Sequence, residues 1–490
     1  MEAWRPPTHR EHRKYPTPII ALSVICCLVG TWALFTSGLT GADLQLTPLV
    51  LSGILLGLIS LFEIRVGLAV LLLAVGLSPE LSINGVTNFR IEDLIFPILF
   101  VVWITKHVAN KERFASTDLK APIFLLLFLA LVSSLNNHIY GGLDLRTATF
   151  RFGKGVEYYF IFLLVLNSFS SFRELRGFVV MLLLTSSLVG LYGLFQFGLQ
   201  GGGDAGFRIT GPPGETANIL GGYYVFHMCL AVGLLPSAKP GHRGLILAYL
   251  GMMLLPFMGT LSRTSYVALF SGVMVIWFLS RNRSIGLVFT LVALFSLLAP
   301  VTTAERFWSI FDVFGTDAPA SWVSRVDGWK ALLSAAIETP VLGRGVGRYP
   351  LGAVDNEYVL QINEIGIVGL LAFVWLISRC LKTSYRLLSE RSPGRPHDPM
   401  LRGFSLGYFG GLTALLVHSL GATTFTTIRT TEPFFFASGI LYCYWNLTHT
   451  RRATAPGAVL DKVETRIGHV APPRPSWRQP SPPAKAQPTG

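Results

Sequence analysis

Residues 178–199 read FVVMLLLTSSLVGLYGLFQFGL, a run without a charged side chain. An α-helix needs about 20 mostly apolar residues to cross the hydrocarbon core of a bilayer. This stretch therefore predicts a membrane-spanning helix, and the same pattern recurs along the chain. We expect about fourteen spans, at residues 19–36, 46–62, 66–78, 93–107, 121–135, 156–171, 178–199, 217–236, 244–260, 264–280, 284–301, 358–378, 404–422 and 433–449.

The composition agrees with a chain of this kind. Of the 490 residues, 51% are hydrophobic and only 14% are charged. Soluble globular proteins carry about 25% charged residues, so the composition excludes an ordinary soluble enzyme. The five cysteines lie in or beside apolar runs and form no CxxC pair. This pattern predicts buried thiols rather than a metal site, and nothing in the sequence calls for a cofactor.

The distribution of basic residues predicts the topology. Cytoplasmic loops of membrane proteins are enriched in Lys and Arg. With the N-terminus inside, 28 of the 40 Lys and Arg fall on the cytoplasmic side, so the net charge of +13 does not require a nucleic-acid partner. We predict cytoplasmic termini, with a basic N-terminus at 1–18, spans at 19–301, an outer loop at 302–357, spans at 358–449 and a disordered tail at 451–490.

The outer loop at 302–357 is longer than the other predicted outer loops. Apolar residues recur in it at helical spacing, at Trp322, Val326, Trp329, Leu332, Leu333, Ala336 and Ile337. This spacing predicts an amphipathic helix over 322–338 that lies on the membrane surface or caps a cavity.

Basic residues on the outer side oppose the topological bias, and ten of the twelve are arginines. They are Arg90, Arg146, Arg151, Lys154, Arg208, Arg263, Arg306, Arg325, Lys330, Arg344, Arg348 and Arg429. The planar guanidinium group matches phosphate oxygens and stays charged, so this set indicates a bound phosphate or pyrophosphate. Pairing with acidic side chains and contact with lipid headgroups are the alternatives for any single arginine.

Three segments place such residues in distinctive surroundings: 207–218, which contains Gly-Pro-Pro-Gly, the turn 259–265, and the glycine-rich stretch 340–349 that follows Arg325. A fourth distinctive segment, 354–369, carries acidic residues and glycines instead. In the third segment Arg344 and Arg348 alternate with glycines, so we expect backbone N–H groups and guanidinium groups to reach an anion together. A dinucleotide fingerprint is excluded because no βαβ unit precedes these glycines.

In this order, the segments resemble the O-antigen ligase and Wzy-type polysaccharide polymerase superfamily. The ligase pattern His-Asn, nine residues and Gly-x-x-Gly corresponds to Asp355-Asn356 and to Gly366 and Gly369. Upstream, an Arg…Trp…Pro-x-x-Gly-x-Gly pattern corresponds to Arg325, Trp329, Pro340, Gly343 and Gly345, and the segment 427–433 resembles the Arg/Glu-Pro segment before the last span.

The resemblance implies a GT-C-like membrane glycosyltransferase of the bacterial inner membrane. It implies substrates of undecaprenyl-diphosphate-linked glycan on the periplasmic face, and a role in surface polysaccharide, exopolysaccharide or O-antigen (lipopolysaccharide) synthesis. By the resemblance, Arg208 and Arg263 hold the pyrophosphate. The ligase histidine is replaced here by Asp355, which favours a polymerase over a ligase.

We therefore predict a polymerase in which Asp355 is the first candidate for the base and Glu357 the second. An Asp-Asn pair ahead of a helix is also a good N-terminal cap, and that alternative stays open. The predicted substrate-binding residues are Arg208, Arg263, Arg325, Arg344, Arg348, Asn356, Glu364, Arg429 and Glu432.

A second basic patch, formed by Arg146, Arg151 and Lys154, is a candidate for binding a second lipid diphosphate, with a surface salt-bridge cluster as the alternative. A polymerase also implies a chain-length regulator and export machinery as partners. The competing functions are an O-antigen ligase that uses a separate acceptor and a transporter of lipid-linked oligosaccharides.

Overall fold

The computed structural model describes residues 59–60, 63–79, 81–83, 86–199, 207–212, 215–283, 285–286, 320–348, 354–390 and 398–453. The predicted N-terminal segment and the span 19–36 lie outside these residues. So do residues 302–319, nearly all of the predicted spans 46–62 and 284–301, and nearly all of the tail.

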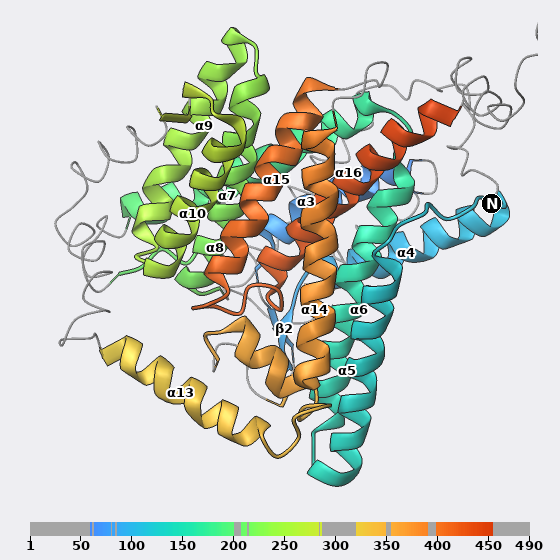
Figure 1. Cartoon of the computed structure of the whole chain (residues 1–490), viewed down its shortest axis with the longest axis vertical. Helices are drawn as coiled ribbons and strands as arrows, with labels where there is room; N and C mark the ends of the chain where they lie inside the picture. The colour runs from blue at the N-terminus through green and yellow to red at the C-terminus, as the bar shows by residue number, and fades with distance from the viewer. Residues whose placement is uncertain are drawn as a thin grey trace, which may run out of the picture.

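The described chain is a helical bundle with one short hairpin (Figure 1). Its helices are α3 (Ile64–Leu77), α4 (Glu92–Ala109), α5 (Lys120–Gly141), α6 (Leu145–Ser168), α7 (Phe172–Leu199), α8 (Ala217–Leu234), η2 (Leu235–Ser237), α9 (Pro240–Gly259), α10 (Arg263–Ser280), α13 (Ala320–Ala336), α14 (Glu357–Ser389), α15 (Pro399–His418) and α16 (Ile428–Ala453). Strands β1 (Leu81–Ile83) and β2 (Val86–Phe89) pair antiparallel, a hairpin that the prediction of an all-helical chain did not include.

Seven of the described helices are long and apolar enough to cross a membrane: α5, α7, α8 with η2, α9, α10, α14 and α15. Each of them overlaps one of the predicted spans, although α15 ends at His418, four residues before the predicted end of the span 404–422. The predicted spans 66–78, 93–107, 156–171 and 433–449 also form helices, but α3 has only 14 residues, and α4, α6 and α16 carry buried charged side chains. The chain is thus a multi-pass helical membrane protein.

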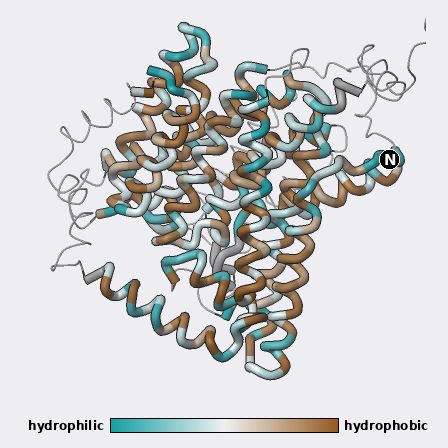
Figure 2. Tube along the Cα trace, in the orientation of Figure 1, coloured by the Kyte–Doolittle hydropathy of each residue, from teal (hydrophilic) through white to brown (hydrophobic). Residues whose placement is uncertain are grey.

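The surface of the bundle agrees with a lipid environment. Large apolar side chains of α5 point outward, with Phe124 71% and Ile139 68% exposed. Figure 2 shows such hydrophobic residues along the outer sides of many helices. A soluble protein would leave few contiguous apolar residues in water.

Close helix packing in the centre depends on small residues. Helix α8 is almost wholly buried and packs against α15, which also packs against α10. A Cβ atom on Gly233 of α8 would lie 2.1 Å from the backbone nitrogen of Gly407 on α15. Glycine at such positions lets two helix backbones approach closely, as is common in membrane proteins.

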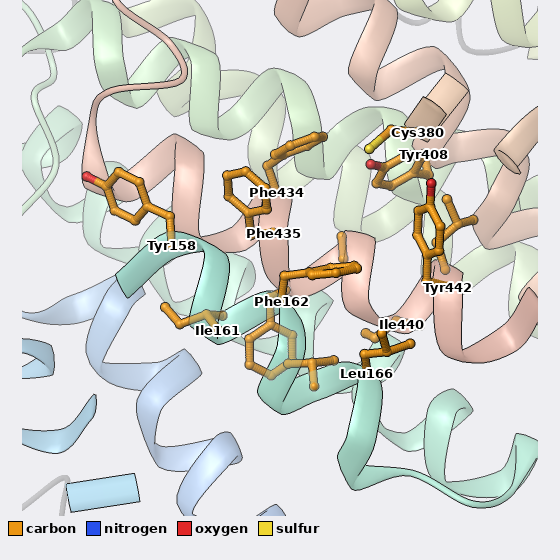
Figure 3. Packing of buried hydrophobic residues seen from close by; sticks show 14 of the residues in the cluster. Tyr158, Ile161, Phe162, Leu166, Cys380, Tyr408, Phe434, Phe435, Ile440 and Tyr442 are labelled. Atoms are coloured by element: carbon orange, nitrogen blue, oxygen red, sulfur yellow. The ribbon is translucent and has the colours of Figure 1, made fainter. Parts of the chain in front are cut away.

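The second part of the core joins α6, α14, α15 and α16 through aromatic side chains (Figure 3). Phe162 and Tyr442 meet edge to face with ring centroids 5.6 Å apart. The Tyr408 and Ser438 hydroxyl groups are 2.7 Å apart, which joins α15 to α16. These contacts hold α16 between α6 and α15.

A helix is present at the place where the amphipathic helix was predicted: α13 lies two residues closer to the N-terminus than 322–338, and its apolar and polar residues are not clearly separated between two sides. It lies at the lower end of the molecule in Figure 1, where the turn between α5 and α6 also lies. Trp329 and Leu332 pack against a small cluster formed by Val354, Val359 and Leu360. On the other side, Ile337, just after the helix, is 76% exposed.

Candidate active site

A cavity of about 1350 Å³ opens among the turn between α5 and α6, the segment that carries Arg208, α13, the start of α14 and the segment before α16. Five of the predicted site residues line it: Arg208, Arg325, Arg348, Asp355 and Glu364. The other six lie outside its lining: Arg263, Arg344, Asn356, Glu357, Arg429 and Glu432. The cavity therefore brings together five of the eleven predicted site residues.

The lining combines two chemical characters. Its charged side chains are seven cationic groups, Arg90, Arg146, Arg151, Lys154, Arg208, Arg325 and Arg348, and four acidic groups, Asp144, Glu215, Asp355 and Glu364. Its apolar part includes Leu126 and Leu127 of α5 and Phe373 and Leu376 of α14. An excess of cations beside an apolar wall fits an anionic head group joined to a hydrocarbon chain.

Arg208 and Arg263 come from neighbouring segments. The Nε atom of Arg208 donates to the Thr260 carbonyl oxygen at 2.9 Å. The Ile209 N–H donates to the Gly259 carbonyl at 2.9 Å. The Arg208 segment is thus held against the turn that leads into α10, whose first residue is Arg263.

Helix α14 is broken at Gly366, whose φ of 72° and ψ of −175° are not helical. The stretch 340–348 fills the break: the Arg344 N–H donates to Asn363 O at 2.6 Å, and the Ile367 N–H donates to Pro340 O at 2.9 Å. A Cβ atom on Gly366 would lie 2.1 Å from the Val341 oxygen, so only glycine fits. The two glycine motifs of the sequence therefore form one backbone junction.

This junction corrects the expectation that the backbone N–H groups of 340–349 face an anion. The N–H groups of Arg344 and Gly345 donate to carbonyls of α14, and the Gly347 N–H donates to Glu364 Oε1 at 2.9 Å. These donors are satisfied within the protein, as buried backbone groups usually are. Of the two arginines in this stretch, Arg348 lines the cavity and donates to the Gly141 carbonyl at 2.7 Å.

Glu364 joins two walls of the cavity. Its Oε1 atom lies 3.1 Å from Nη1 of Arg151, which comes from α6. Its main-chain oxygen accepts from the Ser133 hydroxyl group of α5 at 2.7 Å. The predicted substrate-binding carboxylate therefore fixes Arg151 at the cavity wall.

At the start of α14, one carboxylate faces the cavity and the other does not. Asp355 lines the cavity and pairs with Arg325 of α13 at 2.8 Å, with side chains 32% and 30% exposed. Glu357 is fully buried, accepts from the Phe425 N–H at 2.9 Å, and also accepts from Gln361 at 2.8 Å. Glu357 thus holds α14 to the segment before α16.

Asn356 is the N-cap of α14. Its side-chain oxygen accepts from the N–H groups of Tyr358 and Val359 at 3.0 and 3.1 Å. Its amide nitrogen donates to the Leu420 carbonyl at 3.2 Å. The cap function that the Asp-Asn pair suggested therefore falls to Asn356, which leaves the Asp355 side chain turned toward the cavity.

Another cap lies at the turn between α5 and α6. Asp144 accepts from the N–H groups of Arg146 and Thr147, at 3.2 and 3.1 Å, and from the Thr147 hydroxyl group. These hydrogen bonds, led by the one from the Thr147 side chain, lower the pKa of Asp144. The carboxylate therefore stays negative beside the cationic side chains of the lining.

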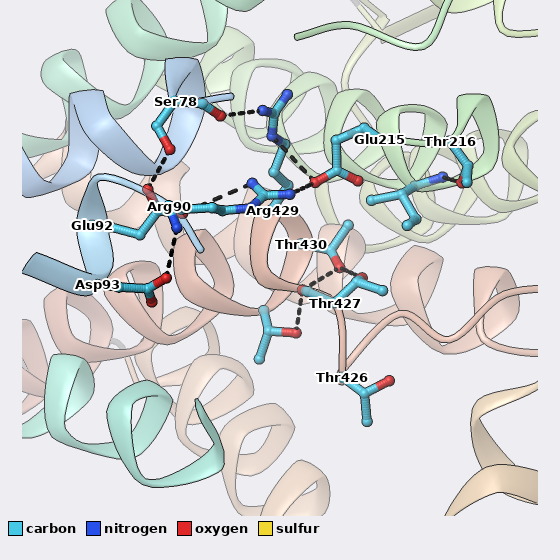
Figure 4. Close-up of polar contacts among 12 residues, drawn as sticks. Ser78, Arg90, Glu92, Asp93, Glu215, Thr216, Thr426, Thr427, Arg429 and Thr430 are labelled. Atoms are coloured by element: carbon cyan, nitrogen blue, oxygen red, sulfur yellow. Dashed lines mark hydrogen bonds and ion pairs between the residues drawn. The ribbon is translucent and has the colours of Figure 1, made fainter. Parts of the chain in front are cut away.

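A buried network of charges lies behind the cavity wall (Figure 4). Arg90 and Arg429 converge on the Glu215 carboxylate, with Arg429 Nε 3.4 Å from its Oε1. Arg429 also donates to the Ser78 carbonyl at 2.6 Å, and Ser78 donates to Glu92 at 2.6 Å. Arg90 and Glu215 line the cavity, whereas Arg429 is fully buried behind them.

Lys154 continues this network toward α6 and α4, where it pairs with Asp93 and, at 3.0 Å, with Glu157. Glu432 is 1% exposed, and within the described part of the chain neither of its carboxylate oxygens has a hydrogen-bond partner. Sequence analysis assigned no role to Glu92, Asp93 or Glu215. The one feature of the sequence that could have indicated them is that each lies within several residues of an arginine on the predicted outer side.

Part of the chain that forms this cavity resembles a known family. Residues 248–374, from α9 into α14, match the family model described as O-antigen ligase. The matched residues include Arg263, Arg325 and Asp355, whereas Arg208 and Arg429 lie outside them. A search of curated proteins found no match. This match, on a multi-pass helical bundle, supports a similarity to the O-antigen ligase-like superfamily over residues 248–374.

Proposed function

We propose that the protein is a membrane glycosyltransferase that polymerises a surface polysaccharide. It transfers a glycan from an undecaprenyl-diphosphate-linked donor to a sugar hydroxyl group of a lipid-linked repeat unit. The observation that carries this proposal is that basic side chains from two separate places line the same cavity. Arg208 comes from the segment against α9 and α10. Arg146 comes from the first turn of α6, and Arg348, from the stretch before α14, contacts the turn between α5 and α6 through Gly141.

In this proposal the two places receive two lipid diphosphates, and the apolar wall receives a polyprenyl chain. Arg208 binds the donor pyrophosphate; Arg263 lies outside the lining, at the start of α10 after the turn that Arg208 contacts. Arg146 and Arg348 bind the diphosphate of the acceptor. A ligase needs only the first of these two places, so the second favours a polymerase.

The chemistry follows from the charges. An acceptor hydroxyl oxygen attacks the anomeric carbon of the donor and forms the new glycosidic bond. The bond from that carbon to the phosphate oxygen breaks, and the pyrophosphate leaves with the electron pair. Arg208 stabilises the growing negative charge, an effect that is strong where water is excluded. Asp355 accepts the hydroxyl proton, oriented by Arg325.

Glu357 and Asn356 support the site without touching substrate. Glu357, the second candidate for the base, instead anchors the start of α14 through Phe425 and Gln361. Arg429 acts behind the wall through Glu215. In this proposal the protein lies in a bacterial inner membrane, its cavity opens to the periplasm, and both of its termini are in the cytoplasm. A chain-length regulator and export machinery receive the product.

The second candidate function is an O-antigen ligase, which the description of the matched family favours. A ligase transfers finished glycan to lipid A core or another separate acceptor. The two functions differ in the acceptor that they need. The test therefore measures the release of undecaprenyl diphosphate from the donor by purified protein reconstituted in lipid. A polymerase releases it from lipid-linked repeat units alone, whereas a ligase releases it only after a separate acceptor is added.

A further inference from the structure

The segment that carries Arg208 is fixed at three points. Near its beginning, Arg208 and Ile209 bond to the turn between α9 and α10. In its middle, Gln196 of α7 clamps Gly211: its amide nitrogen donates to the Gly211 carbonyl at 2.9 Å, and its oxygen accepts from the Gly211 N–H at 3.0 Å. At its end stands Glu215, just before α8.

The attachment at Glu215 is the charged one. The Glu215 side chain is only 3% exposed and meets Arg90 and Arg429, which come from the end of the hairpin and the first turn of α16. Charge-assisted hydrogen bonds in a dry environment are about twice as strong as neutral ones. This carboxylate therefore ties the segment to two elements far away in the sequence.

The position of Glu215 connects this attachment to the site. Glu215 lines the same cavity as Arg208, while Arg429 stands behind it and does not line the cavity. A carboxylate at this place also separates two guanidinium groups that would otherwise repel each other. Removing the Glu215 carboxylate would therefore release one end of the Arg208 segment and disturb the neighbouring part of the cavity wall.

We propose that Glu215 is a positioning residue: held by Arg90 and Arg429, it sets the place of Arg208 in the cavity. Gln196 also positions Arg208, because its two hydrogen bonds fix Gly211 in the same segment. The inference rests on the proposed function, because it assumes that Arg208 binds the donor pyrophosphate. It assigns Arg90 and Arg429 an indirect role in substrate binding through Glu215.

The test compares Arg208→Ala, Glu215→Gln, Glu215→Asp and Gln196→Leu in purified protein reconstituted in lipid. Inorganic pyrophosphate serves as the probe, measured as an inhibitor of transfer from the lipid-linked donor. We expect Glu215→Gln and Gln196→Leu each to raise both the donor KM and the inhibition constant of pyrophosphate about tenfold, with kcat per folded protein changed less than about threefold. Glu215→Asp restores part of the loss.

Gln196→Leu keeps the test decisive if Glu215→Gln fails to fold, because it leaves all charges of the network in place. The double variant Arg208→Ala/Glu215→Gln should bind pyrophosphate no more weakly than Arg208→Ala alone. Full additivity would overturn the inference, since two residues that act through one contact are not additive.

Stronger inhibition of Glu215→Gln by pyrophosphate would also overturn the inference, because Glu215 would then compete with the substrate for Arg90 and Arg429. Failure of the proposed function looks different. In that case Arg208→Ala itself leaves the donor KM and pyrophosphate inhibition unchanged, whatever the Glu215 variants do.

Discussion

At the scale of single residues, Asp355 carries the proposed chemistry. Asp355→Asn keeps the shape of the side chain but removes the proton acceptor. We expect kcat to fall about 100-fold, the lower end of what general base catalysis contributes, with little change in the donor KM. Steady-state kinetics on the reconstituted protein measure both.

Asp327→Asn is the matched control, because Asp327 lies on α13 with its side chain 66% exposed and pairs only loosely with Lys330, at 3.8 Å. This variant should keep the activity of the unchanged protein. An Asp355→Asn variant with full kcat would show that Asp355 is not the base and would make Glu357 the next candidate.

The residues that sequence could identify are those whose surroundings are local. Arg325, Arg348 and Asp355 stand in short motifs, and all three line the cavity. The role of Glu357 depends on Phe425, 68 positions away, and Glu215 meets Arg90 across 125 positions. No spacing within one segment indicates such pairs, so the sequence could rank Asp355 ahead of Glu357 by its motif but could not show that Glu357 is buried away from the cavity.

At the scale of secondary-structure elements, the break in α14 makes a prediction. Gly366→Ala places a side chain on a backbone conformation that is nearly restricted to glycine and against the Val341 oxygen. We expect a loss of more than about 2 kcal/mol in the free energy of unfolding. Denaturant or thermal unfolding in detergent measures it.

Gly251→Ala in α9 is the comparison, because a Cβ atom there meets nothing within 4 Å. Alanine is the better helix former, so this variant should be as stable as the unchanged protein or up to about 1 kcal/mol more stable. Equal stability of the two alanine variants would contradict the account of the break.

The cap of α14 makes a separate prediction. Asn356→Ala removes the acceptor for the N–H groups of Tyr358 and Val359 and should cost about 1 kcal/mol of stability. Asn356→Ser retains a capping oxygen and should cost less. If both variants lose kcat far beyond any loss of folded protein, Asn356 takes part in the reaction directly.

Sequence predicted the elements better than their shapes. Apolar runs located all seven of the described helices that are apolar enough to cross a membrane. The run 358–378 gave no sign of a break, because Gly366 lies among apolar residues that suit a continuous helix equally well. The break depends on hydrogen bonds from the stretch 340–348, which lies in a different part of the sequence.

At the scale of the whole molecule, the bundle explains why the site is where it is. Several elements surround the cavity. The close packing of α8 against α15 holds them in place, together with the aromatic contacts between α6 and α16. Basic side chains gather in the cavity beside an apolar wall, which suits the charged and the apolar part of the proposed lipid substrate. The central claim is that this cavity joins lipid-linked repeat units to one another.

The most direct test is a reconstitution in lipid vesicles with undecaprenyl-diphosphate-linked repeat units as the only substrate and no nucleotide sugar. The products are separated by length on a gel. The account predicts a ladder of lipid-linked glycans that grows with time. Unchanged repeat units, with transfer only after a separate lipid or protein acceptor is added, would contradict polymerisation and establish a ligase.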